Sequence, residues 1–367
     1  MEKKIKVLFI TKKKKSSGPG PYGQTISSGL LNSATFMNNM LVKNGIESNI
    51  VEVVDNNGID KEVHDYKPTH VIIEALWVVP SKFEILTKLH PKVKWIIRLH
   101  SEVPFLANEG IATQWIFEYQ KFDNVIVSVN SPRIEEELNV VLPKPVLYLP
   151  NFYPVNFSEN KSASEKESDI INIGCFGAVR PMKNHLMQAI AAIKFADDMG
   201  YKLRLHINVT RVENNGDPVL KNIRNLFLNS THELVEHTWL KHEEFVQLIK
   251  SMDMCLQVSF SETFNIVTAD AVNMNVPVVV SPEVSWVAGL FKANPTNFKS
   301  IVRKMKLTWL FKPLYLQFLN KVLLYFYSNK SETIWLDYFI QESLCCICGC
   351  DCNTDCGCDC DCNCGCK

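Results

Sequence analysis

The chain has no net charge, and its body has almost no cysteine. Lys+Arg and Asp+Glu both number 39 among the 367 residues, so the formal charge at pH 7 is zero. A chain without a basic excess lacks the electrostatic attraction on which nucleic-acid binding depends, so we expect no nucleic-acid partner. Only Cys175 and Cys255 of the 13 cysteines precede residue 345.

Long apolar runs are also missing. The apolar stretch Val7–Ile10 is soon followed by lysines, which makes it too short for a signal peptide and predicts a cytoplasmic protein. No window has the roughly 20 apolar residues of a membrane span. The nearest, Trp309–Tyr327, contains Lys312 and Lys321. We interpret it as a packed C-terminal helix, and a peripheral helix lying on a membrane surface is the alternative.

The remaining cysteines form a C-terminal tail. Eleven of them fall between Cys345 and Cys366, mostly alternating with Gly, Asp and Asn. Cys-x-Cys thiolates could bind soft metals as a cluster. The repeat nevertheless lacks the Cys-x-x-Cys pairs at defined separation that mark a structural zinc site. We predict that residues 343–367 are a low-complexity, disordered and dispensable tail.

The length of the chain and its pattern predict two α/β domains. A chain of 367 residues exceeds what one hydrophobic core usually holds. Two series of alternating strands and helices are separated by a polar stretch, residues 156–169, which we interpret as a linker. We expect an N-terminal Rossmann-like domain at 1–155, a C-terminal one at 170–305 and C-terminal helices at 306–342.

Both series predict parallel sheets, because short apolar runs alternate with helical patterns. Helical periodicity places Leu30, Ala34, Met37 and Leu41 on one face, and Gly45 suits the left-handed end of that helix. Two such domains facing each other leave a cleft at the carboxyl ends of their strands. The expected strands are Ile5–Thr11, Ile50–Val54, Val71–Trp77, Val93–Leu99, Val125–Val129 and Val146–Leu149, then Ile171–Phe176, Leu203–Val209, Leu234–Trp239, Met254–Val258 and Val276–Ser281.

Two cations follow the first strand of the second series. Gly177 permits a tight turn directly after that strand. Arg180 and Lys183 then precede the predicted helix Leu186–Met199, whose N-terminal N–H groups favour an anion. This arrangement suits a diphosphate, although an Arg and a Lys in a loop are commonly just solvated.

Two carboxylates follow a later strand. Glu262 lies in the loop after Met254–Val258, and we predict Thr263 as the N-cap of the next helix. Asp270 lies within that helix, with seven residues between the two acids. A carboxylate accepts several hydrogen bonds, so one acid could meet sugar hydroxyls while the other meets ribose hydroxyls.

The order of these elements resembles the GT-B glycosyltransferases, and in particular retaining glycosyltransferase family 4. The typical segment there reads Pro-Ser-x-x-Glu-Gly-Phe-Gly, then apolar residues, Glu-Ala and Pro-Val-Val. Ser259, Glu262, Phe264, Ala271 and Pro277–Val279 match it. The resemblance is clearest over residues 170–300. It is looser over 1–155, where the matching landmarks are a first loop with glycines, His100, Ser128–Ser131 and Leu149–Asn151.

The resemblance implies a nucleotide-sugar donor, linked to UDP or GDP, and a glycan or lipid acceptor that it does not identify. It implies that Arg180 and Lys183 neutralise the departing diphosphate, so that no metal and no further cofactor are needed. Glu262 would bind the transferred sugar, Asp270 the ribose, and His100 would face the sugar from the N-terminal domain. The implied catalytic residues are Arg180, Lys183, Glu262 and His100, and the donor-binding residues are Gly177, Arg180, Lys183, Glu262, Thr263, Phe264 and Asp270.

The chain also departs from the family pattern. Asp270 is one methylene shorter than the usual Glu, Thr263 and Asn265 replace common glycines, and no glycine pair follows Ser281. Two other functions therefore stay open: a nucleotide-sugar epimerase of the same architecture, and a catalytically weak module that binds sugar nucleotides.

Overall fold

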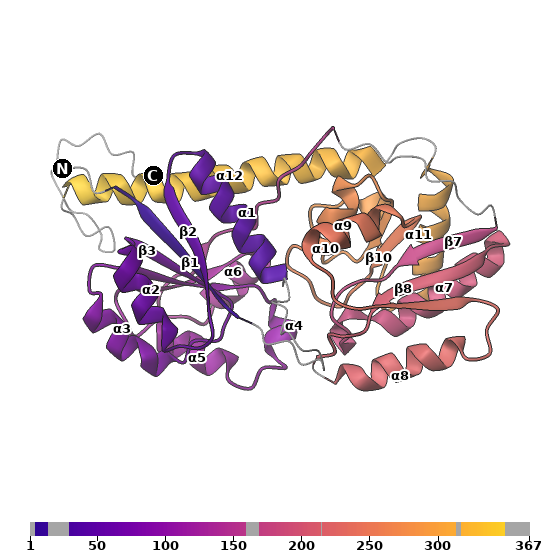
Figure 1. Ribbon diagram of the computed structural model, residues 1–367, viewed down its shortest axis with the longest axis horizontal. Coiled ribbons are helices and arrows are strands. Elements are labelled where there is room, and N and C mark those ends of the chain that lie inside the picture. The colour runs from indigo at the N-terminus through magenta and orange to yellow at the C-terminus, as the bar shows by residue number, and fades with distance from the viewer. Residues whose placement is uncertain (1–3, 14–28, 159–168, 214, 313–316, 349–367) are drawn as a thin grey trace.

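Two parallel β-sheets form the framework of the protein. The computed structural model describes residues 4–13, 29–158, 169–213, 215–312 and 317–348. Each sheet is covered by helices on both sides and forms one lobe, and the lobes lie side by side along the long axis (Figure 1). The N-terminal lobe comprises β1–β6 with α1–α6, and the C-terminal lobe comprises β7–β11 with α7–α11.

The sheet of the N-terminal lobe has the strand order β2-β1-β3-β4-β5-β6, with every neighbouring pair parallel. The strand order reverses beside β1, where β1 pairs with both β2 and β3. The elements are β1 Lys6–Lys12, α1 Gly29–Lys43, β2 Glu47–Val53, α2 Gly58–Tyr66, β3 His70–Glu74, η1 Pro80–Lys82, α3 Phe83–Leu89, β4 Lys94–Leu99, α4 Val103–Leu106, α5 Ala112–Tyr119, β5 Val125–Val129, α6 Pro132–Asn139 and β6 Leu147–Tyr148.

The sheet of the C-terminal lobe has the order β11-β10-β7-β8-β9 and is also parallel throughout. Its strand order reverses between β7 and β10. The elements are β7 Ile170–Gly174, η2 Pro181–Lys183, α7 His185–Met199, β8 Lys202–Asn208, α8 Gly216–Phe227, β9 Glu233–His237, α9 His242–Lys250, β10 Met254–Gln257, α10 Ile266–Asn273, β11 Val278–Val280, η3 Gly289–Phe291 and α11 Phe298–Leu310.

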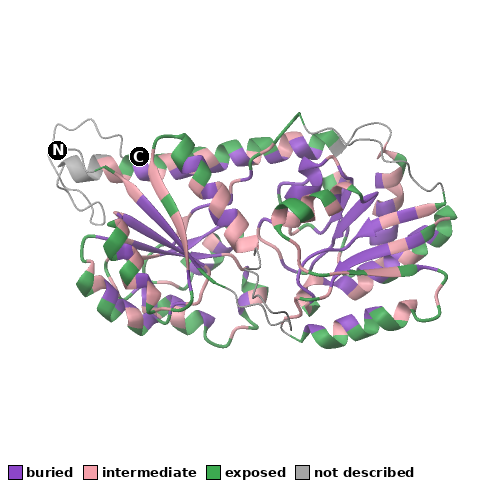
Figure 2. Cartoon of the chain, viewed as in Figure 1, coloured by how far each residue is buried: buried purple, intermediate pink, exposed green. Residues whose placement is uncertain are grey.

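Burial explains why these runs form strands. Figure 2 shows the central strands of both sheets as largely buried. Val7–Ile10 of β1 and Val278–Val280 of β11 have no exposed surface, as expected for parallel strands covered on both faces. Ala34, Met37 and Leu41 of α1 are also fully buried. The α/β fold with two parallel sheets predicted from the apolar pattern is confirmed.

A long C-terminal helix, α12 (Gln317–Cys348), runs along both lobes (Figure 1). Near its start, Tyr327 stacks on Phe264 of the C-terminal lobe with ring centroids 5.3 Å apart. Farther along, Trp335 donates from Nε1 to the carbonyl of Pro150 at 2.8 Å and packs against Phe9 of β1. The helix therefore ties the two lobes together.

The end of α12 corrects the predicted start of the tail. The helix continues to Cys348, past the boundary expected at residue 343. Its turn near Glu342 is anchored to the N-terminal lobe, because that carboxylate lies 2.6 Å from Lys94 Nζ and 3.5 Å from His70 Nε2. The rest of the cysteine-rich tail, residues 349–367, lies outside the described residues, and so do residues 159–168 of the predicted linker.

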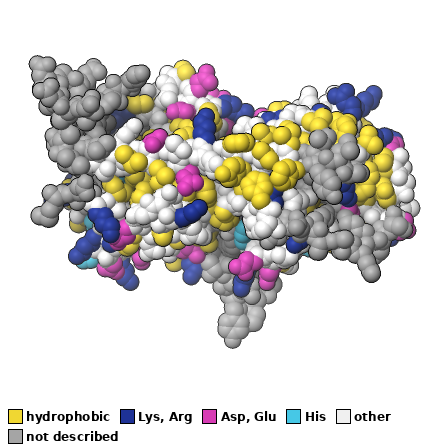
Figure 3. Space-filling model, turned by 90° about the horizontal axis from the view of Figure 1, so that it is seen from above, with side chains coloured by type: hydrophobic (Ala, Val, Ile, Leu, Met, Phe, Trp, Pro, Cys, Tyr) yellow, Lys and Arg dark blue, Asp and Glu magenta, His cyan; other side chains and the backbone are white. Residues whose placement is uncertain are grey.

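The outer face of α12 carries apolar side chains. Seen from above, hydrophobic side chains gather across the upper surface of the molecule (Figure 3). Those of α12 that are exposed are Phe318, Leu319, Tyr325, Phe326 and Ile340. None of the described helices combines the length and the apolarity that crossing a membrane requires.

Candidate functional site

A cavity of about 610 Å³ lies between the two lobes. In the N-terminal lobe its walls come from the start of α1 and from the segments that follow β3, β4 and β6. In the C-terminal lobe they come from the segments that follow β7, β8, β9 and β10. In open parallel sheets, ligands bind at the carboxyl ends of the strands where the strand order reverses. β7 and β10 are those strands here. All the site residues predicted from the sequence line this cavity: Gly177, Arg180, Lys183, Glu262, Thr263, Phe264, Asp270 and His100.

Gly177 shapes the turn after β7. Its φ of 119° lies in the region that side chains disfavour, and its N–H donates to Asn208 Oδ1 at 3.0 Å. The chain then passes through Arg180 into η2, and Asn184 closes that turn with a φ of 56°. Asn184 Nδ2 donates to the carbonyl of Val258 at the end of β10, at 3.0 Å. The turn is therefore fixed to the same sheet edge that carries Glu262.

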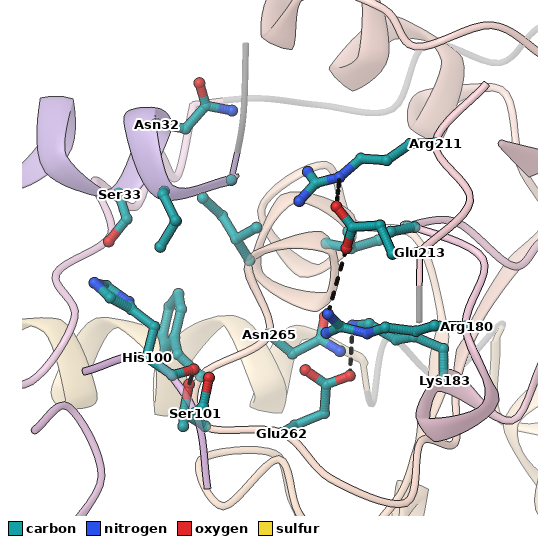
Figure 4. A pocket seen from close by; sticks show the side chains of 18 of the residues that line it. Asn32, Ser33, His100, Ser101, Arg180, Lys183, Arg211, Glu213, Glu262 and Asn265 are labelled. Carbon is teal, nitrogen blue, oxygen red and sulfur yellow. Dashed lines mark hydrogen bonds and ion pairs between the residues drawn. The ribbon is translucent and has the colours of Figure 1, made fainter. Parts of the chain in front are cut away.

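Arg180 forms a chain of charges with residues that follow β8. Its Nη1 lies 3.7 Å from Glu213 Oε2, and Arg211 Nε donates to Glu213 Oε1 at 2.7 Å (Figure 4). The guanidinium of Arg180 also lies over the ring of Phe105 from the N-terminal lobe, 4.5 Å from its centroid. One carboxylate is thus shared by two guanidinium groups at the wall of the cavity.

The backbone holds these two loops together. Val179 N–H donates to the carbonyl of Arg211 at 2.9 Å, and Glu213 N–H donates to the carbonyl of Val179 at 3.0 Å. Gly216 makes this approach possible, because a Cβ at that position would lie 2.1 Å from the carbonyl oxygen of Val179. Arg180, Arg211 and Glu213 are therefore held by a rigid backbone.

Lys183 is paired with Glu262. Lys183 Nζ lies 2.5 Å from Glu262 Oε1, and both side chains are nearly buried, with 12% and 8% of their surfaces exposed. Burial lowers the pKa of Lys183, and Arg180 lowers it further, against the opposing effect of Glu262. Figure 4 shows Arg180 and Lys183 approaching Glu262 from the same side. The structure thus brings together the cations and the first acid of the predicted site.

His185 lies directly behind these cations at the start of α7. It is 2% exposed. Burial, with the positive charges of Lys183 and Arg180, lowers its pKa to about 3. The imidazole is therefore neutral at pH 7 and adds no charge to this wall.

The side chains of Thr263 and Phe264 make contacts that the sequence did not predict. The predicted N-cap Thr263 is wrong: Asn265 caps α10, and its Oδ1 accepts from Thr268 N–H at 2.9 Å. The Thr263 hydroxyl instead accepts from Asn130 Nδ2 of the N-terminal lobe at 3.2 Å. Phe264 is 2% exposed, and its ring packs between Trp286 and Tyr327 in the core. Its side chain is a core residue, although the residue borders the cavity.

Asp270 borders the cavity but is covered. Only 1% of its surface is exposed. Its Oδ1 accepts a hydrogen bond from the hydroxyl of Tyr153 at 2.7 Å and lies 2.9 Å from His242 Nε2. The second acid is therefore engaged by two side chains of the protein itself.

His100 belongs to a buried network within the N-terminal lobe. Its Nε2 pairs with Glu74 and lies 3.2 Å from Arg98 Nη1. Asn130 Nδ2 lies 3.3 Å from its Nδ1. Burial lowers the pKa of His100 despite the charge of Glu74. The ring lines the cavity, but its nitrogens face partners in its own lobe.

Arg211, Glu213 and His242 also line the cavity, although no sequence motif pointed to them. Arg211 and Glu213 follow β8 closely, just as Arg180 follows β7. The rule that ligands gather after the carboxyl ends of strands could have flagged them. His242 carries no local motif, because its importance arises from the contact with Asp270. Within the described residues, no group of three or more His, Cys, Asp or Glu is placed to hold a metal ion.

No protein-family model matches the sequence, and no curated protein matches it either. Solved structures do match. The chain is similar to sucrose-phosphate synthase from Thermosynechococcus elongatus, with a TM-score of 0.66 at 12% identity, covering 93% of this chain and 100% of that one. It is also similar to Anabaena HepE in complex with UDP-glucose, with a TM-score of 0.62 at 13% identity, covering 93% and 99%.

The N-terminal domain of Candida albicans trehalose-6-phosphate phosphatase has the same architecture, with a TM-score of 0.63 at 12% identity, covering 94% of this chain and 97% of that one. Because 93–94% of this chain is covered, the similarity extends over both lobes. The chain has the GT-B fold that the sequence motifs predicted.

Proposed function

We propose that this protein is a glycosyltransferase that moves a sugar from a UDP- or GDP-linked donor to a glycan or lipid acceptor, with retention of configuration. The observation that carries the proposal is the convergence of Arg180, Lys183 and Glu262 on one cavity between the lobes. Glu262 comes 79 residues after Lys183 in the sequence, and the order of the motifs predicts all three residues.

The chemistry of that wall suits a departing diphosphate. Arg180 and Lys183 are fixed by backbone and ion-pair contacts, so little reorganisation is needed when negative charge grows on the leaving group. Glu262 holds the Lys183 ammonium and can also accept hydrogen bonds from sugar hydroxyls. We propose that the C-terminal lobe binds the donor through Gly177, Arg180, Lys183, Glu262 and the backbone of Thr263 and Phe264.

We propose that the N-terminal lobe binds the acceptor. Its wall presents Glu102, Glu109 and Ser101 beside His100, groups that suit sugar hydroxyls better than phosphate. HepE, which shares the fold, was solved with UDP-glucose and with UDP and glucose. The cations of the C-terminal wall supply the charge that a metal would otherwise supply, so we expect no metal requirement.

The direct test is turnover of UDP- and GDP-sugars with release of the nucleoside diphosphate. Glu262→Gln keeps the size of the side chain but removes the charge that pairs with Lys183, and we expect it to abolish most turnover. Glu236→Gln is the control, because Glu236 makes a similar pair with Arg224 on the surface, away from the cavity. Full activity of Glu262→Gln would refute the assignment.

The same assay separates the two alternatives. An epimerase would return an altered nucleotide-sugar with no acceptor present, and a binding module would bind the donor without turnover. Contact with a membrane stays a prediction. Flotation of the protein with anionic lipid vesicles, compared with a Phe326→Ser variant on the exposed face of α12, tests it.

A further inference from the structure

Asp270 is too deeply buried to contact the ribose of a donor nucleotide directly, which is the role that its place in the motif suggests. The side chain is 1% exposed, and Tyr153 and His242 both engage Oδ1. A ligand in the cavity would have to displace one of these partners to reach that oxygen. Aspartate is also one methylene shorter than glutamate, so it reaches less far into the cavity.

His242 stands between Asp270 and the cavity. It is the first residue of α9, it lines the cavity, and 23% of its side chain is exposed. The ring is oriented by two contacts. Its Nε2 lies 2.9 Å from Asp270 Oδ1, and Phe36 of the N-terminal lobe packs edge-on against it with centroids 5.6 Å apart. Among the described residues, Nδ1 has no hydrogen-bond partner, which leaves that atom available to a ligand.

The electrostatics favour a hydroxyl over a phosphate at this position. The carboxylate of Asp270 is buried beside the ring of His242, and the negative charge of Glu243 also affects the ring. Burial lowers the pKa of His242, but the hydrogen bond and charge of Asp270, together with Glu243, outweigh it and raise the pKa above its usual value. The negative charges of Asp270 and Glu243 beside the imidazole disfavour an anion. A hydroxyl can donate to Nδ1 when the ring is neutral and can accept from Nδ1 when the ring is protonated.

Building on the proposed function, we infer that His242, held by Asp270, is the residue that reads the ribose hydroxyls of the nucleotide. Nδ1 of His242 makes the contact. Asp270 and Tyr153 are positioning residues that fix the ring, and Phe36 couples its orientation to the N-terminal lobe. The ligand group is the 2′,3′-diol of a nucleoside diphosphate. A 2′-deoxy or 3′-deoxy analogue lacks one of these two hydroxyls.

Two substitutions distinguish the contributions of the two ring nitrogens of His242. The amide of Asn overlays Nδ1, so His242→Asn keeps a polar group toward the ribose and loses the bond to Asp270. The amide of Gln overlays Nε2, so His242→Gln keeps the bond to Asp270 and loses the ribose contact. His90 is the matched control, because its Nε2 lies 2.7 Å from Asp60 in a similar pair outside the cavity.

The experiment is calorimetry of the full chain with UDP and with its 2′-deoxy and 3′-deoxy analogues, and with the GDP series in parallel. We expect the wild type to bind the ribonucleotide about tenfold more tightly than at least one deoxy analogue, as befits one lost hydrogen bond. His242→Gln should reduce that ratio to about one. His242→Asn should keep part of it, and His90→Asn and His90→Gln should keep all of it.

The outcomes are distinct. If the wild type binds the deoxy analogues as tightly as UDP or GDP, the inference is overturned without recourse to any variant. An unchanged ratio in a folded His242→Gln protein overturns it as well. If neither UDP nor GDP binds the wild type at all, the proposed donor class itself fails.

Discussion

The C-terminal wall of the cleft carries Arg180, Lys183 and Arg211, whereas the N-terminal wall carries Glu102, Glu109 and His100. Burial raises the pKa of both glutamates of the N-terminal wall. On the C-terminal wall, burial lowers the pKa of Arg180 and Lys183. One wall is thus prepared for an anion and the other for neutral hydroxyls. This difference would suit the proposed transfer of a sugar from a charged donor to an uncharged acceptor.

The two sides of the cleft also differ in where their charged residues find ion-pair partners. On the N-terminal side, Arg98 is fully buried and bonds to Glu74 and to the carbonyl of Leu149, so the charges are satisfied within the lobe. On the C-terminal side, Glu213 and Glu262 satisfy the cations at the surface of the cavity itself. We infer that the first arrangement supports the fold and that the second can be exchanged for a ligand.

The largest effect should come from breaking the buried pair. We expect Arg98→Ala to lower the free energy of unfolding by about 3–5 kcal/mol, because the buried carboxylate of Glu74 loses the guanidinium that pairs with it. Urea unfolding measures this. Arg224→Ala removes a guanidinium that pairs with Glu236 on the surface and should cost no more than about 1 kcal/mol. Equal losses in the two variants would contradict the inference that the buried Arg98–Glu74 pair supports the fold.

Removing a cation of the C-terminal wall should act on turnover rather than on stability. We expect Lys183→Ala to reduce kcat by a factor of about 100–1000, equivalent to roughly 3 kcal/mol, because one charge on the leaving group loses its partner. Release of nucleoside diphosphate is the readout. Lys194→Ala, which removes an exposed lysine paired with Asp198, should leave turnover unchanged. A Lys183→Ala enzyme with normal kcat would argue against a diphosphate at this wall.

The neutral imidazole behind the cations predicts a pH dependence of stability. The pKa of His185 is about 3 in the folded protein, below its ordinary value of 6.5. The unfolded chain therefore takes up a proton first as the pH falls. The neutral imidazole of His185 contributes fully to the free energy of unfolding above pH 6.5. That contribution is lost as the pH falls toward 3, and about 2 kcal/mol of it is gone at pH 5. Unfolding free energies at pH 7.5 and 5 should differ less in His185→Gln than in the wild type, and an identical difference would refute the assignment.

The smallest effect concerns Glu213, the carboxylate that Arg180 and Arg211 share. Because it competes with a diphosphate for both guanidinium groups, we expect Glu213→Gln to bind UDP or GDP about fivefold more tightly at low salt, roughly 1 kcal/mol. Calorimetry at two salt concentrations checks this, and the gain should shrink as screening increases. Weaker binding would instead show that Glu213 serves to position the two cations.

Local patterns predicted the elements well because the central strands, such as β1, β3, β4 and β10, are short, largely apolar and almost entirely buried. The predicted run Val93–Leu99 became β4, and Met254–Val258 became β10. Motif order also placed Arg180, Lys183 and Glu262 at one cavity, since the carboxyl ends of parallel strands meet at one sheet edge. The N-cap at Thr263 was wrong because Asn265 offers a competing acceptor two residues later.

The sequence by itself determined two α/β lobes and the side chains that follow their strands, because periodicity and turn chemistry are local properties of the chain. Only the tertiary structure decided which charges are paired, that Asp270 is covered by Tyr153 and His242, and that α12 returns to the N-terminal lobe. Those features depend on contacts between residues more than 20 positions apart. No local pattern encodes such contacts, since they arise only when distant parts of the chain pack together.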